Sequence, residues 1–406
     1  MVRSHSSARE KTPMKLTYQT TILSCFVGYV VQAIVNNFVP LLFVTFQDSY
    51  DIPLSQITLL VTVNFGVQLL TDLLATKFVD KMGYRISIIA AHVLSALGLV
   101  LLTVLPEVMP PFTGILTAVV IYAVGGGLLE VLVSPIMESC PTDNKEAAMS
   151  LLHSFYCWGH VGVVLISTIF FQVVGTDHWK LLARGWALIP VLNAVIFAKT
   201  PMAPLIAEGE QGMTLKDLFV NKTFWLLMVM MVCSGASEQA VSQWASAFAE
   251  QGLGISKTAG NLAGPMAFAV CMGSARAIYG KFGHRIDLDT FMKRSSILCI
   301  CAYLLISLSP LPALSLLGCA VCGMSVGILW PGTFSKASAA LRNGGTAMFA
   351  LLALAGDLGC SGGPTVVGIV SDFFGGAFHA GILAAVIFPV TLLALLCIKS
   401  RYHPHN

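Results

Sequence analysis

A short phrase that occurs twice, two hundred residues apart, constrains this chain more than any other feature. The first copy is DKMGYR at residues 80–85, and the second is GKFGHR at residues 280–285. Each copy is a basic turn with a central glycine that follows two hydrophobic segments and precedes a third. A repeat of this period in so apolar a chain indicates that a six-helix membrane unit was duplicated. Such duplication is typical of secondary transporters, and much less so of membrane enzymes or receptors.

The composition excludes a water-soluble globular protein. Of the 406 residues, 56% are hydrophobic and 11% are charged, and the mean hydropathy is +0.80. Soluble domains carry about 25% charged residues. Spanning helices of about 20 residues would number about twelve in a chain of this length, with short loops between them. The net charge of +3 belongs to the loops, so no nucleic-acid partner is expected.

The apolar segments predict an all-α membrane protein with about twelve transmembrane helices in two six-helix halves related by pseudo-twofold symmetry. The predicted parts are a tail at 1–17, a first half at 18–199, a linker at 200–222, a second half at 223–398 and a tail at 399–406. The expected spans are 18–44, 54–78, 86–105, 112–136, 147–173, 180–199, 223–249, 257–280, 289–309, 312–338, 343–371 and 378–398. In the linker, LKDLF at 215–219 predicts a short amphipathic helix on the membrane surface.

The distribution of basic residues predicts the orientation in the membrane. Nineteen Lys and Arg residues fall on one side of the predicted spans, and three fall on the other: Lys180, Arg184 and Lys257. The positive-inside rule then places both termini, the linker and both repeated turns in the cytoplasm. The first apolar segment lacks a cleavage pattern, so we expect a retained helix in a plasma (inner) membrane protein. A monomer is expected, and the 11 cysteines are interpreted as packing residues.

The repeated turn resembles the loop between helices 2 and 3 of the major facilitator superfamily, G-x-x-x-D-R-x-G-R-R. Both copies keep a basic residue, the glycine and the final arginine of that loop: Lys81, Gly83 and Arg85 in the first copy, and Lys281, Gly283 and Arg285 in the second. The first copy also keeps the acid as Asp80, which Gly280 replaces in the second. The resemblance implies the fold of this superfamily and a role for these residues in a cytoplasmic gate.

Other segments are similar to the fucose–proton symporter branch of sugar permeases. They are NNFVP at 36–40, Glu130 five residues before Pro135, HSFYCWG at 153–159, and the glycine-rich stretch 356–372 that ends in Ser-Asp. The similarity implies import of a sugar driven by the proton gradient. Asn36 stands where the symporters carry an aspartate, and this departure bears on the route of proton coupling.

Glu130 is the predicted proton-coupling residue. A carboxylate inside a membrane span costs a few kcal/mol or more, so its presence needs a reason. Glu130 follows three glycines at 125–127, which let neighbouring backbone approach closely. As water access changes, such a carboxyl can be neutral in one state of a carrier and charged in another. The alternative interpretation is a glutamate that is permanently hydrogen-bonded to another helix.

Polar and aromatic side chains inside the spans are predicted to bind the solute. In the seventh span, Gln239 and Gln243 share a face at i and i+4, with Glu238 alongside. Sugar hydroxyls need donors and acceptors, which amide side chains supply in fixed geometry. Packing between helices is the alternative for each residue. Trp244 could supply a flat apolar surface for a sugar ring, and an interfacial position is its alternative. The predicted substrate-binding residues are Asn36, Asn37, Gln68, His153, Tyr156, Trp158, Glu238, Gln239, Gln243, Trp244 and Trp330.

A second set of residues is predicted to gate the cytoplasmic side. Asp72 and Asp357 lie in the second and eleventh spans, which face each other across the two halves in the superfamily. Arg276, the one basic residue that is assigned to neither side, could act similarly with the fifth span or could snorkel to the interface. The predicted gating residues are Asp72, Asp80, Lys81, Gly83, Arg85, Arg276, Lys281, Gly283, Arg285 and Asp357.

Enzyme activity, cofactors and metal ligands are not expected. His153 and His160 are two turns apart, about 10 Å along a helix, which is too far for one metal ion. No convergent nucleophile, base or metal set is recognisable. The prediction is therefore a secondary active transporter that moves a small polar solute, with protons and the lipid bilayer as its other partners. The alternatives are an exporter of amphipathic organic compounds and a non-transporting sensor on a transporter fold.

Overall fold

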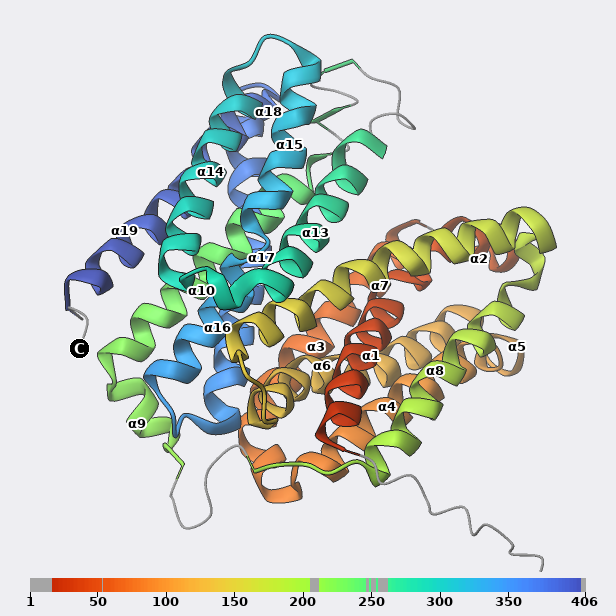
Figure 1. Ribbon diagram of the computed structural model, residues 1–406. Coiled ribbons are helices and arrows are strands. Elements are labelled where there is room, and N and C mark those ends of the chain that lie inside the picture. Colours follow the sequence, from red (N-terminus) through yellow and green to blue (C-terminus); the bar gives the residue numbers. More distant parts are fainter. Residues whose placement is uncertain are drawn as a thin grey trace, which may run out of the picture.

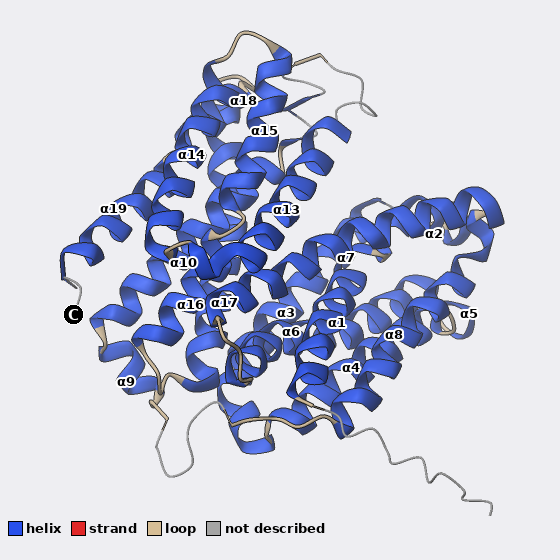
Figure 2. Cartoon of the chain, viewed as in Figure 1, coloured by secondary structure: helices blue, strands red, loops and turns tan. Residues whose placement is uncertain are grey.

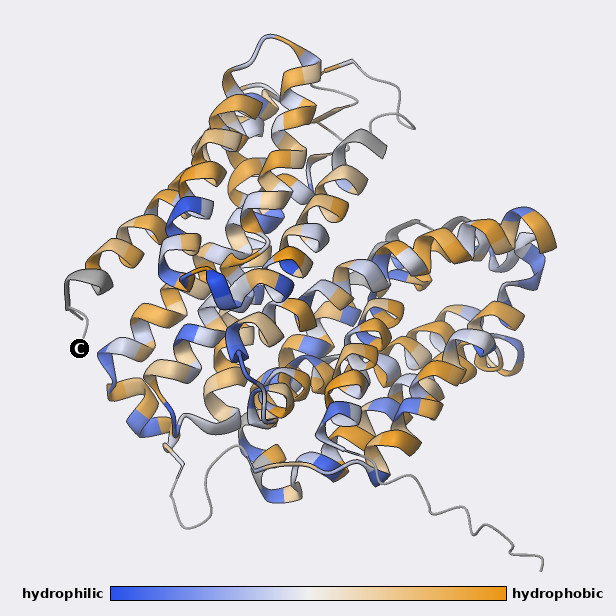
Figure 3. Ribbon diagram, viewed as in Figure 1, coloured by the Kyte–Doolittle hydropathy of each residue, from blue (hydrophilic) through white to orange (hydrophobic). Residues whose placement is uncertain are grey.

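The computed structural model describes residues 17–52, 54–204, 212–245, 248–249, 253–254 and 262–402. Within these ranges the chain forms helices and connecting loops, without strands (Figure 2). Two helical bodies, coloured red to yellow-green and green to blue in Figure 1, meet at one end and diverge at the other. Hydrophobic residues predominate along most of the helices (Figure 3), as is typical of helices that span a membrane.

The first body is the predicted N-terminal half. Its spans are α1 (Tyr18–Asn37), α3 (Leu54–Met82), α4 (Tyr84–Leu102), α6 (Pro111–Ser139), α7 (Lys145–Val174) and α8 (Trp179–Lys199). The short elements η1 (Val39–Leu42), α2 (Phe43–Tyr50), α5 (Leu105–Val108) and η2 (Thr176–His178) connect them. On α8, Leu181, Leu188 and Leu192 are more than half exposed, whereas Asn193 is buried. This helix therefore turns an apolar face outward and a polar residue inward.

The second body is the predicted C-terminal half. Its elements are α10 (Lys222–Ser242), η4 (Leu262–Met266), α13 (Ala267–Phe282), η5 (Gly283–Arg285), α14 (Leu288–Leu308), α15 (Pro312–Val326), α16 (Leu329–Ala340), α17 (Gly345–Phe373), α18 (Phe378–Ala384) and α19 (Ile387–Tyr402). In the described residues, ten segments are long and apolar enough to cross a membrane, and α3 and α13 complete the twelve-helix arrangement. The predicted fold class is confirmed.

Three predicted spans are interrupted. The segment 223–249 is α-helical as α10 only to Ser242, and 312–338 is divided into α15 and α16 at Gly327. The last span is divided into α18 and α19 after Ala384. The break between α15 and α16 frees the carbonyl of Gly327, which accepts a hydrogen bond from Nε of Arg276 at 2.9 Å. The predicted span 257–280 lies partly outside the described residues.

The linker contains α9 (Leu215–Val220), the short helix predicted from LKDLF. Thr214 and Asp217 form a capping box at its N-terminus, which satisfies backbone donors there. At the opposite end of the molecule, Lys180 and Tyr50 donate hydrogen bonds to Glu107 of the short helix α5. These two bonds hold the pKa of Glu107 below its ordinary value. This ion pair is exposed, so its removal provides a comparison for the removal of a buried carboxylate.

Small residues let α10 and α17 pack against each other. A Cβ on Gly359 of α17 would collide with the carbonyl group of Val232 in α10. We expect Gly359→Ala to lower the unfolding free energy by about 1–3 kcal/mol, because overpacking displaces the backbone. Thermal unfolding of the purified protein measures this effect. Gly362→Ala is the matched control, since a Cβ there meets nothing within 4 Å, and equal losses in both variants would contradict the packing argument.

Candidate functional site

Three carboxylates from both halves lie together in the interior. One carboxylate oxygen from each of Asp72 in α3, Glu130 in α6 and Asp357 in α17 lies within 4.8 Å of the others. Asp72 is fully buried, and the other two are partly buried. Two unit charges about 4 Å apart repel by about 4 kcal/mol at an effective dielectric constant of 20. Three negative charges this close therefore require protons or a cation between them.

Gln32 of α1 completes this carboxylate cluster. Its Nε2 donates a hydrogen bond of 2.8 Å to Oε2 of Glu130, and the residue is 3% exposed. Its carbonyl oxygen Oε1 is buried and accepts no hydrogen bond. Both carboxylate oxygens of Asp72 likewise lack a hydrogen-bond donor, although the carboxyl groups of Asp72 and Asp357 interact with each other. We name Asp72, Glu130, Asp357 and Gln32 the carboxylate cluster.

The three glycines before Glu130 bring the neighbouring helices to it, as the sequence predicted. A Cβ on Gly126 would contact Val35 of α1 and Gln68 of α3, and one on Gly127 would meet Thr71 and Gln68 of α3. This contact between α6 and α3 brings Glu130 beside Asp72.

The predicted amide residues of the first half form a connected group. Oδ1 of Asn36 accepts hydrogen bonds from Nε2 of Gln68 at 2.7 Å and from Nδ2 of Asn64 at 3.4 Å. Its Nδ2 lies 3.5 Å from the hydroxyl of Tyr156 in α7. Asn37 instead donates to the carbonyl of Ala33 in its own helix. Asn36, Gln68 and Tyr156 are thus assembled at one place.

His153 of α7 lies at the boundary between the halves. Its Nε2 is 3.4 Å from the hydroxyls of Tyr29 and Ser134, which are 2.9 Å from each other. Its ring stacks on Phe334 of α16 with centroids 5.8 Å apart. The imidazole is therefore held by the first half on one side and by the second half on the other.

Arg276 connects the second half to α7. Its guanidinium makes an ion pair of 2.9 Å with Glu238 of α10, and both side chains are largely buried. The same guanidinium contacts the carbonyl oxygen of His153 at 3.4 Å and Sγ of Cys157 at 3.2 Å. The alternative in which Arg276 snorkels to the interface is wrong, because its side chain is 5% exposed and fully engaged.

The remaining predicted residues of the second half are held locally. Gln243 donates to Gln239 at 3.2 Å, which confirms their shared helical face. Nε1 of Trp244 donates to the carbonyl of Pro364 at 2.9 Å, and its ring lies against Phe378. Trp330 packs against Gly356, where a Cβ would collide with its ring. These two tryptophans are therefore anchored inside the second half.

Trp158 lies on α7 and reaches across to the second half. It is 38% exposed, and its ring is in contact range of a Cβ on Gly273 of α13. Trp158 thus differs from Trp244 and Trp330, because it contacts the half to which it does not belong.

Hydrogen bonds between the halves lie toward one side of the described structure, the side on which the repeated turns fall. Ser150 donates to the carbonyl of Arg276 at 2.9 Å, and Ser338 donates to Glu138 at 2.7 Å. The hydroxyls of Tyr84 and Thr346 are also hydrogen-bonded. These residues lie near the helix ends on the predicted cytoplasmic side, except Arg276, which lies nearer the middle of α13.

The two copies of the repeated turn have different local structures. Gly83 has φ +82° and precedes α4, whereas Gly283 has φ −58° and is buried against α7. Arg85 donates to the carbonyls of Phe197, Ala198 and Thr200 at the end of α8, within its own half. Arg285 contacts His284, and Lys281 lies over the ring of Phe282.

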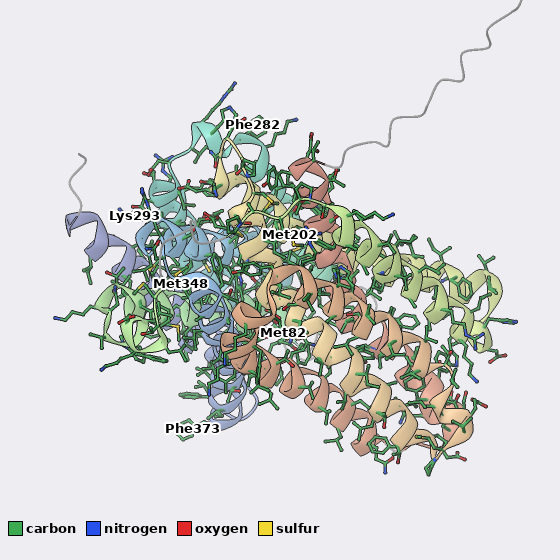
Figure 4. The ribbon with its side chains drawn as sticks, turned by 90° about the horizontal axis from the view of Figure 1, so that it is seen from below. Met82, Met202, Phe282, Lys293, Met348 and Phe373 are labelled. Carbon is green, nitrogen blue, oxygen red and sulfur yellow. The ribbon has the colours of Figure 1, made fainter. Side chains whose placement is uncertain are left out.

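Figure 4 views this end of the molecule and labels Met82 and Phe282, which belong to the two turns and lie on opposite sides of the bundle. Lys81 is exposed, and the side chain of Asp80 lies outside the described residues. Of the predicted gating residues, the structure brings together Asp72 and Asp357, and it connects Arg276 to α7.

Several residues that bond to the predicted site were missed from the sequence. Gln32, Tyr29, Ser134 and Cys157 each bond to a predicted residue. Gln32 had a detectable signal, because it lies four residues before Asn36 and therefore on the same face of the first span. The serine and cysteine are common packing residues of membrane helices and had no such signal.

The fold defines a twelve-helix membrane transporter of two similar halves. A family model described as Major Facilitator Superfamily matches residues 23–364. The chain belongs to the Major Facilitator Superfamily.

Solved structures show the same fold. The transporter FucP in the outward conformation aligns with a TM-score of 0.79 and 17% identity over 96% of this chain and 100% of that chain. A second solved structure, of a variant of FucP, described as the E. coli fucose:proton symporter, aligns with a TM-score of 0.76 and 17% identity over 96% of this chain and 100% of that chain. The human organic anion transporter MFSD10 aligns with a TM-score of 0.70 and 15% identity over 95% and 100%. No curated protein sequence matches the chain.

Proposed function

We propose that this protein is a secondary active transporter that moves a small, uncharged polar solute such as a monosaccharide, in symport with protons. The observation that carries the proposal is the carboxylate cluster, to which both halves contribute. Protonation of these carboxyl groups removes their mutual repulsion. The stability of the contact between α3, α6 and α17 therefore depends on bound protons. Movement of the halves is thereby linked to the proton gradient.

The contacts between the halves support an alternating-access cycle. They gather on the predicted cytoplasmic side, while the two bodies diverge at the other end (Figure 1). Breaking them and forming new ones on the opposite side would expose a central solute to the cytoplasm. We place both termini in the cytoplasm and the chain in the plasma membrane on the basis of the basic residues. A monomer suffices for this cycle.

The charges near the site favour an uncharged solute over an anion. Asp72, Glu130, Asp357 and Glu238 supply four carboxyl groups, and the buried Arg276 is already paired with the last of them. An organic anion would meet negative potential in this region. Amides of Asn36, Gln68 and Gln239 supply the donors and acceptors that hydroxyl groups require.

Counterflow in proteoliposomes tests the proposal. Vesicles loaded with an unlabelled monosaccharide should accumulate the labelled sugar transiently, and a panel of sugars identifies the preferred one. Inhibition by lipophilic organic compounds without sugar counterflow would support an exporter of amphipathic compounds. Ligand binding without any counterflow would support a sensor.

We expect Gln239→Ala to weaken binding of the transported sugar several-fold, because one hydrogen bond contributes about 0.5–1.5 kcal/mol. Competition against labelled sugar on the purified protein measures the change. Gln172→Ala is the control, since Gln172 is exposed near the end of α7. Unchanged affinity in the Gln239 variant would assign this residue to packing with Gln243.

A further inference from the structure

The carboxylate cluster contains acceptors without donors. The amide nitrogen Nε2 of Gln32 donates a hydrogen bond to Glu130, and its buried carbonyl oxygen Oε1 has no hydrogen-bond partner. Both oxygens of the fully buried Asp72 also lack a donor. A buried acceptor that is left unpaired costs free energy, and the three adjacent carboxylates repel one another, so protons or a cation are expected between these oxygens.

Side chains do not supply that positive charge. In the described part of the chain, the ion pairs of Lys and Arg involve Glu138, Glu107, Glu238 and Asp289, and none involves Asp72, Glu130 or Asp357. The other ionisable groups with electrostatic interactions reaching these carboxylates are Tyr29 of α1, Tyr156 of α7 and Cys360 of α17, and none is a cation. The compensating charge therefore comes from solution.

We propose that Asp72, Glu130, Asp357 and the Gln32 carbonyl form a binding site for a sodium ion, which competes with protons for the same oxygens. The spacing fits, because oxygens up to 4.8 Å apart can contact one ion placed between them. Carboxylate and amide oxygens are hard ligands, which suit a hard cation better than a transition metal. The expectation of no metal rested on the histidine spacing and did not include these carboxylates.

The position of the ion gives it a role in the transport cycle. Asp72 and Glu130 belong to the first half and Asp357 belongs to the second, so a bound cation joins the halves through α17. Separation of α17 from α3 and α6 removes one ligand and releases the ion. This inference rests on the proposed transport function and adds sodium as a second occupant of its proton-coupling site. A monovalent ion suits such a cycle, because it must leave at every turnover.

Binding of radiolabelled sodium to the purified full-length protein tests the site. We expect saturable binding at neutral pH, with choline as the replacement cation, and weaker binding at mildly acidic pH because protons occupy the carboxyls. Asp72→Asn and Asp357→Asn should each weaken sodium binding roughly 10–100-fold. Gln32→Leu leaves all three carboxylates in place and should weaken it roughly tenfold. Glu107→Gln, in the exposed pair with Lys180, should bind sodium like the wild type.

Several outcomes overturn the inference. They are absence of saturable sodium binding at every pH, unchanged binding in Asp72→Asn and Gln32→Leu, or displacement of sodium by low concentrations of calcium, which indicates a divalent site. Melting temperatures measured in choline show whether each variant is folded. If an aspartate variant is unfolded, sodium binding by Gln32→Leu tests the site in its place. Sugar counterflow that persists without any sodium binding would sink the sodium site and leave the transport proposal standing. Sodium binding without flux of any solute would support the sodium site and contradict the transport proposal.

Discussion

Glu130→Gln is expected to abolish uphill accumulation of the solute in proteoliposomes, so that its internal concentration only equals the external one. The glutamine keeps the shape of the protonated acid and can still pair with Gln32, but it can neither release nor rebind a proton. Exchange needs no net proton movement, and downhill flux needs no proton gradient to drive it, so both should continue in part. Uptake driven by an imposed pH gradient, measured beside counterflow, separates the two activities.

Glu107→Gln is the control for the loss of a carboxylate, since this residue of the short helix α5 is 51% exposed and lies outside the spans. It should accumulate the solute like the wild type. If Glu130→Gln still concentrates the solute against its gradient, Glu130 takes no part in coupling, and Asp72 and Asp357 become the remaining candidates.

Glu238→Gln is expected to lower the free energy of unfolding by about 3–5 kcal/mol, because it leaves the buried guanidinium of Arg276 without its counter-charge. The side chains of the pair are 5% and 13% exposed for Arg276 and Glu238. Thermal unfolding of the detergent-solubilised protein, followed by tryptophan fluorescence, measures the loss. Solute flux should fall as well, because Arg276 also contacts His153 and Cys157 in the other half.

Two further variants test the physical reason. Glu107→Gln breaks an exposed ion pair with Lys180 and should cost about 0–1 kcal/mol. Removing both buried charges, in Glu238→Met with Arg276→Met, should recover much of the stability while flux stays low. An equal loss in Glu238→Gln and Glu107→Gln would show that the buried pair is as well hydrated as the surface pair.

The spans were predictable because apolar length is a local property of the chain. Their interruptions were not predictable, since they depend on partners from elsewhere. The break at Gly327 is an example: its carbonyl is satisfied by Arg276, which is 51 residues away in the sequence. The glycines before Glu130 did indicate close packing, and the structure shows that α3, which carries Gln68 and Thr71, packs against two of them.

The candidate site was predictable in its residue types but not in its pairings. Glu130 was assigned to proton coupling, and Asp72 and Asp357 were assigned to the gate, whereas the structure places the oxygens of all three together. Glu238 was predicted to bind solute, and its ion pair with Arg276 was not predicted. Trp244 was a candidate platform for a sugar ring, and its indole is held by the Pro364 carbonyl.

The chain alone determined that this is a duplicated helical membrane protein, because hydropathy and the repeated turn are read residue by residue. The tertiary structure decided which buried charges compensate one another and which do not. Helices that are distant in the sequence set those distances, and electrostatic energy inside a membrane depends on distance far more than on residue type. Arg276 thus finds Glu238, while three carboxylates gather without a cationic side chain among the described residues.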